Sequence, residues 1–405
     1  MMPWKKQVFY SSRYNFLVFL LTPALIITAM ISQEGFLFSL SLLFILFISV
    51  NKFYLSYVVK KLSIQEEVTT LRLFPEEEAT FKIPLENHGK IPVYHAKLEL
   101  LVYDSDEAIQ VKDVEGLEKN KTNFISHLSI PASKKRPFTL DFTAVKRGIV
   151  QIRSIKLVIH DLFGFNKVYL QYDGKYRSSA IVYPAPKSIT GLEKITRQEK
   201  GSQSMPFSMY EDLMMTRGNR DYSSADPFNR INWKASARKD SLQTKVYEKV
   251  TLSKWTIVVN VNNPNPLSVT IDNLEEVLSQ VTYTCQFAVK HDISFEVYIN
   301  IRIPGASSGL YLPIGHGKEH LTKALEIFAR IRKVALTVPI THVLYTMTHK
   351  AEQPDSIIHF GTYGDAEKTE YNKLVQHGAR LHIVSAQETE METDTDKNAV
   401  KEGAQ

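Results

Sequence analysis

Hydrophobic residues follow three patterns along the chain, and each pattern predicts a different architecture. Near the start lie two long apolar runs, Tyr14–Ile31 and Phe36–Val50, and the second run extends to about residue 55. A membrane-spanning helix needs about 20 mostly apolar residues. These runs therefore predict two N-terminal transmembrane helices, over residues 14–31 and 36–55. The polar residues between them, Ser32–Gly35, predict a tight helical hairpin within residues 1–61.

Positive charges flank the predicted hairpin and are missing from its loop. The flanking cations are Lys5, Lys6 and Arg13 before the first run, and Lys52, Lys60 and Lys61 after the second. Because positively charged flanks stay on the cytoplasmic side, we expect a multi-pass protein of the cell membrane. Both termini and the large domains would then be cytoplasmic. A cleavable signal peptide is the alternative, but the second run follows at once without a small-residue cleavage site.

From residue 62 to 185 the hydrophobic period changes to two. Phe81, Ile83 and Leu85 alternate with polar residues, and Ile155, Leu157 and Ile159 do so again. Strands of this kind, with turn residues between them and no long helical pattern, predict an all-β, sandwich-like middle domain. No cluster of catalytic or metal-binding residue types gathers there.

Residues 186–253 combine a linker with a charged segment. Asp226-Pro227 predicts a helix start, with Asp226 as the N-cap. Phe228, Ile231 and Ala235 would form its apolar underside. The candidate contact residues are Arg220, Tyr222, Asp226, Arg230, Trp233, Lys234 and Arg238. Two interpretations stay open: arginine–carboxylate pairs that join domains internally, or a surface that binds a ligand or protein. The segment offers no histidine and no activated nucleophile, so it predicts no catalytic residue.

Residues 254–386 alternate between strand and helix patterns. Trp255–Val261 is an apolar run typical of a strand covered on both faces. The elements that follow are helices over Ile271–Val289, 318–333 and 366–377, and strands over Ile293–Ile301, His342–Thr346, Ser356–His359 and Leu381–Val384. This alternation predicts a C-terminal α/β doubly wound domain. The acidic tail, residues 387–405, is predicted to be disordered.

Composition and isolated motifs narrow the choice of function. The net charge of +6 is small for 405 residues, which favours an anionic membrane surface over a dedicated nucleic-acid partner. The one cysteine, Cys285, fits a buried helical position. His316-Gly-Lys-Glu-His320 matches the H-x-x-E-H pattern of one class of zinc peptidase. Glycines on both sides of His316 place it in a loop, so we interpret the match as coincidence.

The charged segment resembles the signature of bacterial domain-of-unknown-function family 58. The matching residues are Arg220, Tyr222, Asp226, Arg230-Ile-x-Trp233-Lys234 and Ala237-Arg238. Three further stretches, Arg147-Gly148, Asp161-Leu-Phe-Gly164 and Val182-Tyr-Pro184, fit the same family, as do the paired apolar runs. The family's usual Pro-Gly before the Asp is Ser224-Ala225 here, which predicts a less sharply turned loop.

The resemblance implies a von Willebrand factor A-like C-terminal domain and two partners, a MoxR-type AAA+ ATPase and a transglutaminase-like membrane protein. A-like domains bind a divalent ion through Asp-x-Ser-x-Ser, where the matching positions of this chain read Asn260-Val-Asn262-Asn263-Pro264. Because an amide replaces the charged ligand, this loop is interpreted as a degenerate metal site. We expect no bound metal and no cofactor.

Together these observations favour a membrane-anchored, cytoplasm-facing adaptor or scaffold that performs no chemistry. Two alternatives stay open. The Asn260 loop would bind a ligand through a metal ion, or His316, Glu319 and His320 would serve a hydrolase.

Overall fold

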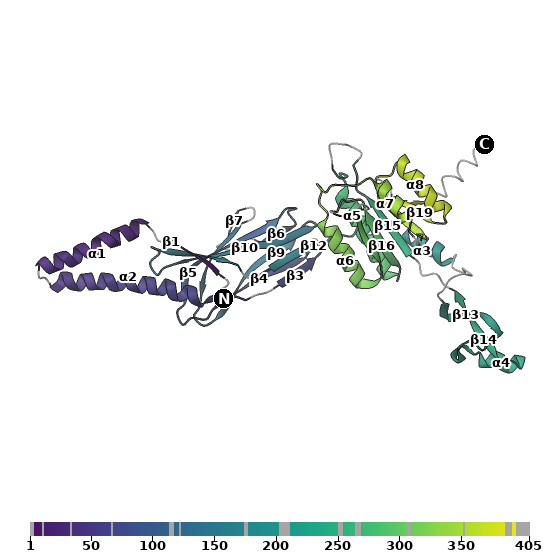
Figure 1. Ribbon diagram of the computed structural model, residues 1–405, viewed down its shortest axis with the longest axis horizontal. Helices are drawn as coiled ribbons and strands as arrows, with labels where there is room; N and C mark the ends of the chain where they lie inside the picture. The colour runs from purple at the N-terminus through teal and green to yellow at the C-terminus, as the bar shows by residue number, and fades with distance from the viewer. Residues whose placement is uncertain are drawn as a thin grey trace. The chain divides into compact units, whose positions relative to one another are not determined.

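The computed structural model divides into two compact units, Met1–Pro184 and Ala185–Gln405, shown in Figure 1. The residues it describes are 4–9, 12–32, 35–65, 68–112, 117–120, 123–173, 177–201, 211–249, 254–263, 269–303, 305, 309–350, 353–384 and 391–393.

The first unit opens with a helical hairpin. Helices α1 (Ser12–Ser32) and α2 (Gly35–Lys61) lie side by side, as Figure 1 shows. Most apolar side chains along α2 up to residue 53 are exposed, including Phe36 at 73% and Leu43 at 62%. Such a long exposed apolar surface is unusual for a helix surrounded by water.

The last turns of α2 belong to the core of the β-rich region. Tyr54, Leu55, Val58 and Val59 are buried there among strand residues. The Tyr54 hydroxyl donates to the Pro92 carbonyl (3.2 Å) and accepts from the Tyr94 N–H (3.3 Å). Because the packing and these hydrogen bonds act together, α2 is joined firmly to the β region.

Two sheets make up that region. The larger sheet has eight strands, which follow the order β1-β11-β10-β5-β8-β7, with β12 on β10 and β3 on β12. The smaller sheet has the order β2-β4-β9-β6. The strands of the larger sheet are β1 (Trp4–Phe9), β3 (Val68–Leu73), β5 (Val93–Asp104), β7 (Leu117–Asn120), β8 (Asn123–Ile130), β10 (Gly148–His160), β11 (Lys167–Tyr172) and β12 (Arg177–Val182). Those of the smaller sheet are β2 (Leu62–Ile64), β4 (Glu78–Asn87), β6 (Ile109–Val111) and β9 (Lys135–Ala144).

The hydrophobic alternation explains the core of this region. Phe81, Ile83 and Leu85 of β4 are 0%, 0% and 1% exposed, because every second side chain of a strand points to the same face. Phe81 stacks on Phe142 of β9 with ring centroids 4.6 Å apart. Strand β1 pairs antiparallel with β11, so the chain that enters the hairpin and the chain that leaves it both belong to this β region.

The second unit contains a mixed six-stranded sheet of order β17-β16-β15-β18-β19-β20. Its strands are β15 (Lys254–Asn260), β16 (Ser294–Ile299), β17 (Leu310–Gly315), β18 (Ser356–Gly361), β19 (Arg380–Val384) and β20 (Met391–Thr393). Its helices are α3 (Leu192–Gly201), α5 (Leu274–Lys290), α6 (Gly317–Arg330), α7 (Ile340–Thr348) and α8 (Asp365–Gln376). A separate two-stranded sheet, β13 (Glu211–Asp221) with β14 (Gln243–Lys249), carries the 3-10 turn η1 (Phe228–Arg230) and α4 (Trp233–Lys239).

The predicted fold class is wrong. Among the described residues, only α2 is long and apolar enough to cross a membrane, and α1 contributes the shorter apolar stretch Leu20–Ser32. Two N-terminal transmembrane helices are therefore not what the structure shows. The C-terminal sheet is also not a doubly wound, von Willebrand factor A-like sheet. Both of its edge strands run antiparallel to their neighbours, which the pattern of apolar runs did not reveal.

The segment His342–Thr346, predicted as a strand, lies in helix α7. Ile340, Val343, Leu344 and Met347 are its buried residues, at the spacing of one helical face. A short apolar run does not distinguish a strand from a buried helix. Within the tail predicted to be disordered, the structure describes only Met391–Thr393, and these form β20 against β19. The rest of that tail lies outside the described residues.

Candidate functional site

The segment Arg220–Arg238, which resembles the family signature, lies in the β13–β14 region, which we name the signature module, residues 211–249. Its helix α4 begins at Asn232, whose side chain accepts a hydrogen bond from the Ala235 N–H (3.2 Å). The helix ends at Asp240, whose φ of 55° is left-handed. Ile231 is 3% exposed and bridges to Thr244 of β14, which fixes the chain between η1 and α4.

Asp226 is not the N-cap that the Asp-Pro pair predicted. Pro227 precedes η1 without a side-chain cap, and Asn232 caps α4. The Asp226 carboxylate instead accepts hydrogen bonds from Arg220 Nη2 (2.5 Å), the Ser223 N–H (3.0 Å) and Thr244 Oγ1 (3.3 Å). It therefore closes the loop between β13 and η1. The hydrogen bond from Arg220, and next that from Ser223, lower the pKa of Asp226.

Two polar residues that sequence reasoning missed, Ser236 and Gln243, complete the module. Gln243 is 2% exposed and donates through Nε2 to Asp221 Oδ1 (2.5 Å). Ser236 Oγ donates to the Asn232 carbonyl and accepts from the Gln243 N–H, both at 2.9 Å. The hydrogen bond from the Gln243 side chain, and next that from Lys239, lower the pKa of Asp221. A serine and an asparagine four residues apart at a helix start are the only sequence signal for this arrangement.

The two bulky apolar residues of the segment face solvent. Phe228 is 72% exposed and Trp233 is 66% exposed, so the predicted apolar underside of one continuous helix is wrong. Tyr222 is half-buried, with its ring centroid 5.9 Å from that of Phe228. Lys234 and Arg238 are exposed on α4. Ile231 has an extended backbone, so η1 and α4 are two separate elements instead of one helix. Phe228 on η1 and Trp233 on α4 both face solvent.

The predicted contact residues are thus only partly brought together. Arg220 joins Asp226, whereas the Arg230 guanidinium lies over the Tyr247 ring, 5.6 Å from its centroid. Phe228 on η1 and Trp233, Lys234 and Arg238 on α4 are exposed and are therefore available to a partner. We name Phe228, Trp233, Lys234 and Arg238 the exposed aromatic–cationic surface.

Replacing Asp226 with asparagine is expected to loosen this loop. At neutral pH the Ser223 amide should exchange its hydrogen roughly two- to fivefold faster, because the variant lacks the charged acceptor that binds this N–H and Arg220. The effect is small because an exposed ion pair contributes little to stability. Since the folded pKa of Asp226 is lowered, the stabilisation is present above the ordinary carboxyl pKa and is lost as the pH falls through the lowered value. Hydrogen exchange measured by mass spectrometry checks this. Asp240→Asn is the matched control, and an unchanged Ser223 amide would contradict the role of Asp226.

The asparagines of the predicted degenerate metal loop connect neighbouring strand ends. Asn260, at the end of β15, is 1% exposed. Its Oδ1 accepts from Asn300 Nδ2 (2.8 Å) and the Asn262 N–H (3.2 Å), and its Nδ2 donates to the Thr362 carbonyl (2.8 Å). An amide oxygen with two hydrogen bonds has both lone pairs engaged.

The other two asparagines of this loop also bind protein groups. Asn262 Oδ1 accepts from Thr337 Oγ1 (3.1 Å), and Asn263 Nδ2 donates to the Thr270 carbonyl (3.0 Å). Among the described residues, no group of three or more His, Cys, Asp or Glu side chains could hold a metal ion. The side-chain amides of Asn260, Asn262 and Asn263 hold the loops together at this end of the sheet.

The H-x-x-E-H residues do not form one site. His316 is the residue before α6, and its side chain makes no capping hydrogen bond. His320 is 7% exposed, and its Nε2 lies 2.9 Å from the Phe295 carbonyl. Burial lowers the pKa of His320. Because its ring nitrogen is engaged by backbone, His320 has a packing role.

A buried charge that sequence reasoning missed lies on β16. Glu296 is 3% exposed and accepts from Thr256 Oγ1 (2.8 Å), Tyr311 Oη (2.9 Å) and Lys350 Nζ (3.1 Å). Lys350 also lies over the Tyr298 and Tyr311 rings. Burial alone would raise the pKa of Glu296, but the hydrogen bonds from Thr256 and Lys350 outweigh it and lower that pKa. The sequence signal for this buried charge was a glutamate within the apolar run Ile293–Ile301.

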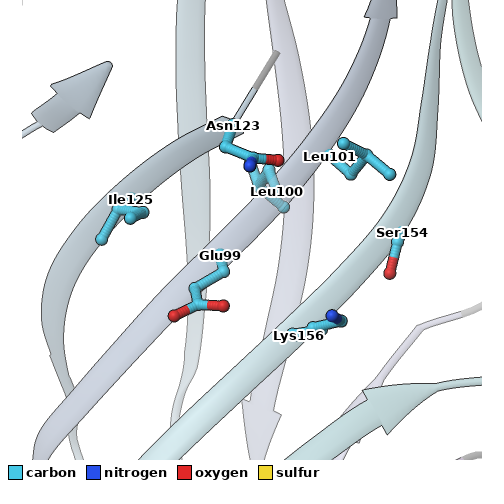
Figure 2. A pocket seen from close by; sticks show the side chains of 7 residues that line it. All are labelled: Glu99, Leu100, Leu101, Asn123, Ile125, Ser154 and Lys156. Atoms are coloured by element: carbon cyan, nitrogen blue, oxygen red, sulfur yellow. The ribbon is translucent and has the colours of Figure 1, made fainter. Parts of the chain in front are cut away.

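A hollow of about 300 Å³ lies on the larger sheet of the first unit, and Figure 2 shows the side chains that line it. Its lining comes from three adjacent strands: Glu99, Leu100, Leu101, Asn123, Ile125, Ser154 and Lys156. Glu99 pairs with Lys97 (3.2 Å), and Lys156 is its cross-strand neighbour. The Ser154 hydroxyl in this lining has no hydrogen-bond partner among the described residues, so no base activates it as a nucleophile.

Comparisons with known proteins do not identify a family. No family model matches the chain, and no curated protein matches it. Solved structures similar to it include the CARDB domain of a Pyrococcus furiosus protein (13% identity, 30% of this chain, 87% of that chain, TM-score 0.17). They also include a non-cellulosomal cohesin from Archaeoglobus fulgidus (12%, 34% and 97%, TM-score 0.20) and the cohesin CaCohA2 from Clostridium acetobutylicum (14%, 30% and 90%, TM-score 0.22). None of these is a von Willebrand factor A-like domain, and at such TM-scores they carry no argument about function. The resemblance to family 58 stays a prediction.

Proposed function

We propose that this chain is a membrane-held scaffold that binds a partner protein through its signature module and performs no reaction. One observation carries the proposal. Phe228 and Trp233 are 72% and 66% exposed on a module whose loop is closed by the Arg220–Asp226 pair. Large aromatic side chains on an ordered surface are the residues that most often dominate protein binding.

The chemistry of the exposed aromatic–cationic surface specifies the partner. Two aromatic rings favour an apolar pocket, and Lys234 and Arg238 favour acidic residues around it. The family resemblance makes a MoxR-type AAA+ ATPase the first partner to test and a transglutaminase-like membrane protein the second.

The membrane part of the proposal rests on α2. Its exposed apolar side chains would be covered by lipid, with α1 packed along it. Strand β1 pairs with β11, so the segment before α1 belongs to the same β region that buries the end of α2. Lys60 and Lys61 in the last turn of α2 favour the cytoplasm as the side on which α2 ends.

No catalysis and no cofactor enter this proposal. Two described features support it. His320 is engaged by the Phe295 backbone, and Cys285 is fully buried, which raises the pKa of its thiol and keeps it protonated.

Replacing both Phe228 and Trp233 with alanine is expected to weaken binding to the purified MoxR-type ATPase about tenfold or more, because interface aromatics supply much of the binding free energy. The measurement is a titration of the full chain, solubilised in detergent, against the ATPase. Tyr345→Ala is the matched control, since Tyr345 on α7 is an aromatic residue 59% exposed outside the module. Equal affinity of the double variant and the unchanged chain would refute the contact role.

A further inference from the structure

The turn between β10 and β11, Asp161–Asn166, is held by one buried carboxylate. Asp161 is 0% exposed. Its Oδ1 accepts from the N–H groups of Phe163 (3.3 Å) and Phe165 (2.8 Å). Its Oδ2 accepts from the N–H and the side-chain amide of Asn166, both at 3.0 Å. Four hydrogen bonds to one carboxylate leave this turn little freedom to change its backbone.

This ordered turn presents two phenylalanines outward. Phe163 is 57% exposed and Phe165 is 44% exposed, and their rings are stacked with centroids 6.5 Å apart. Gly164 between them has a φ of 79°, a conformation that glycine adopts without strain. The backbone therefore holds both rings on the surface instead of letting them fold into the core.

The turn is continuous with the apolar surface of α2. The Phe163 ring lies 4.5 Å from that of Phe47, and Phe47 stacks on Phe44 with centroids 6.4 Å apart. Leu43 and Leu46, on the same stretch of α2, are each 62% exposed. Whatever covers this stretch of α2 must also reach Phe163.

We propose that the Asp161–Asn166 turn is a second membrane contact, in which Phe163 and Phe165 enter the interfacial layer of the bilayer that holds α2. This inference rests on the proposed membrane location of α2. Aromatic rings are favoured at the boundary between acyl chains and headgroups. The exposed Lys167 directly after the turn suits an anionic headgroup layer. Together with the buried end of α2, the turn fixes the β region against the membrane at two places.

Lipid is favoured over a protein as the occupant because the apolar surface is continuous from the turn to α2. Along α2 the exposed apolar side chains are Phe36, Phe38, Leu40, Leu42, Leu43, Ile45, Leu46, Val50 and Phe53. A surface of this length matches the hydrocarbon layer of a bilayer.

The test places single tryptophans in the full chain and reconstitutes it into vesicles of phosphatidylcholine and phosphatidylglycerol. Part of the phosphatidylcholine is brominated, in one set of vesicles close to the carbonyl end of its acyl chains and in a second set near their middle, because bromine quenches tryptophan emission only on close approach. The reporters are Phe163→Trp and Phe165→Trp, with Leu43→Trp on α2 as the membrane reference. Val145→Trp is the matched control. Val145 is 44% exposed in the turn that precedes β10, whereas the Asp161–Asn166 turn follows that strand. Emission of the unsubstituted chain is subtracted, since it contains three tryptophans.

We expect quenching at positions 163 and 165 comparable with that at position 43, and none at position 145. Quenching at 43 without quenching at 163 and 165 would overturn the second contact while leaving α2 in the membrane. The turn would then face water or a protein. Absence of quenching at 43 would refute the membrane location itself, and the inference with it. Quenching at 145 as well would show that the β region lies broadly on lipid, which also overturns a specific role for the turn.

Discussion

Replacing Gly361 with alanine is expected to lower the local stability of β18 by about 2 to 5 kcal/mol, the sum of left-handed backbone strain and overpacking. Gly361 has a φ of 94°, and a Cβ built there would lie 2.0 Å from the Asn260 carbonyl oxygen. Asn260 and Gly361 are register partners at the ends of β15 and β18. A methyl group would therefore separate the strand ends that the Asn260 side chain joins through the Thr362 carbonyl.

Gly378→Ala separates the two causes. Gly378 has a comparable φ of 101°, but a Cβ there would meet nothing within 4 Å. Its substitution should cost only the backbone strain, about 1 to 2 kcal/mol. Hydrogen exchange of the β18 amides in the detergent-solubilised full chain measures the first variant, and exchange in β19 measures the second. Equal losses would show that the close approach of Gly361 to Asn260 has no energetic weight.

Replacing Lys350 with methionine is expected to destabilise β16 by about 2 kcal/mol at neutral pH. Removing one partner of a buried pair leaves an uncompensated charge, which costs about 3 to 5 kcal/mol when both partners are buried. Here Lys350 keeps 32% of its side chain exposed, and Lys254 lies 4.0 Å from Glu296, so the loss is smaller. Exchange of the β16 amides is the measurement.

The loss should depend on pH with a definite sign. With Lys350 present, the pKa of Glu296 is lowered, so the pair stabilises the fold above the ordinary carboxyl pKa. Without Lys350, the hydrogen bond from Thr256 and the charge of Lys254 are left to oppose the effect of burial, so the pKa of Glu296 should be higher than in the unchanged chain and ionisation of the buried carboxylate should cost stability. The difference between the two chains should be small near pH 3 and grow toward pH 7, because ordinary carboxyl groups ionise at about pH 4.

Lys373→Met is the matched control for this prediction. Lys373 forms a 2.7 Å pair with Glu370 on the surface of α8, and its side chain is 50% exposed. An exposed helical pair contributes about 0.3 to 0.5 kcal/mol. If the two lysine variants lose the same stability, Glu296 is not the buried charge that the fold depends on.

Hydrophobic periodicity was sufficient to predict a strand or helix wherever the geometry of that one element determines which of its side chains are buried. The alternation at Phe81, Ile83 and Leu85 lies in β4, and the apolar run from Trp255 ends at Asn260 in β15. The helical spacing around Cys285 lies in α5, where the thiol is buried. These side chains are covered through their own strand or helix geometry, which the order of residues contains.

Hydrophobic periodicity could not predict contacts between segments that are distant in the sequence. Asp226-Pro227 reads locally as a helix start, yet Asp226 binds Arg220 and Thr244 from the two strands that flank the loop. The apolar run at His342–Thr346 lies in helix α7, whose buried residues share a core cluster with Tyr371 and Leu374 of α8, and the run by itself does not specify this packing. Likewise the antiparallel edges of the C-terminal sheet, which make the predicted fold class wrong, depend on strand pairing and not on strand pattern.

The same division applies to the candidate surfaces. The order of residues was enough to mark the segment from Arg220 to Arg238 and the apolar stretch at residues 36–55 as unusual. Which rings face outward, and that Phe163 meets Phe47 more than a hundred residues away in sequence, follows only from the folded chain. Burial and long-range pairing are properties of all the packed elements together, whereas hydrophobic period is a property of one segment at a time.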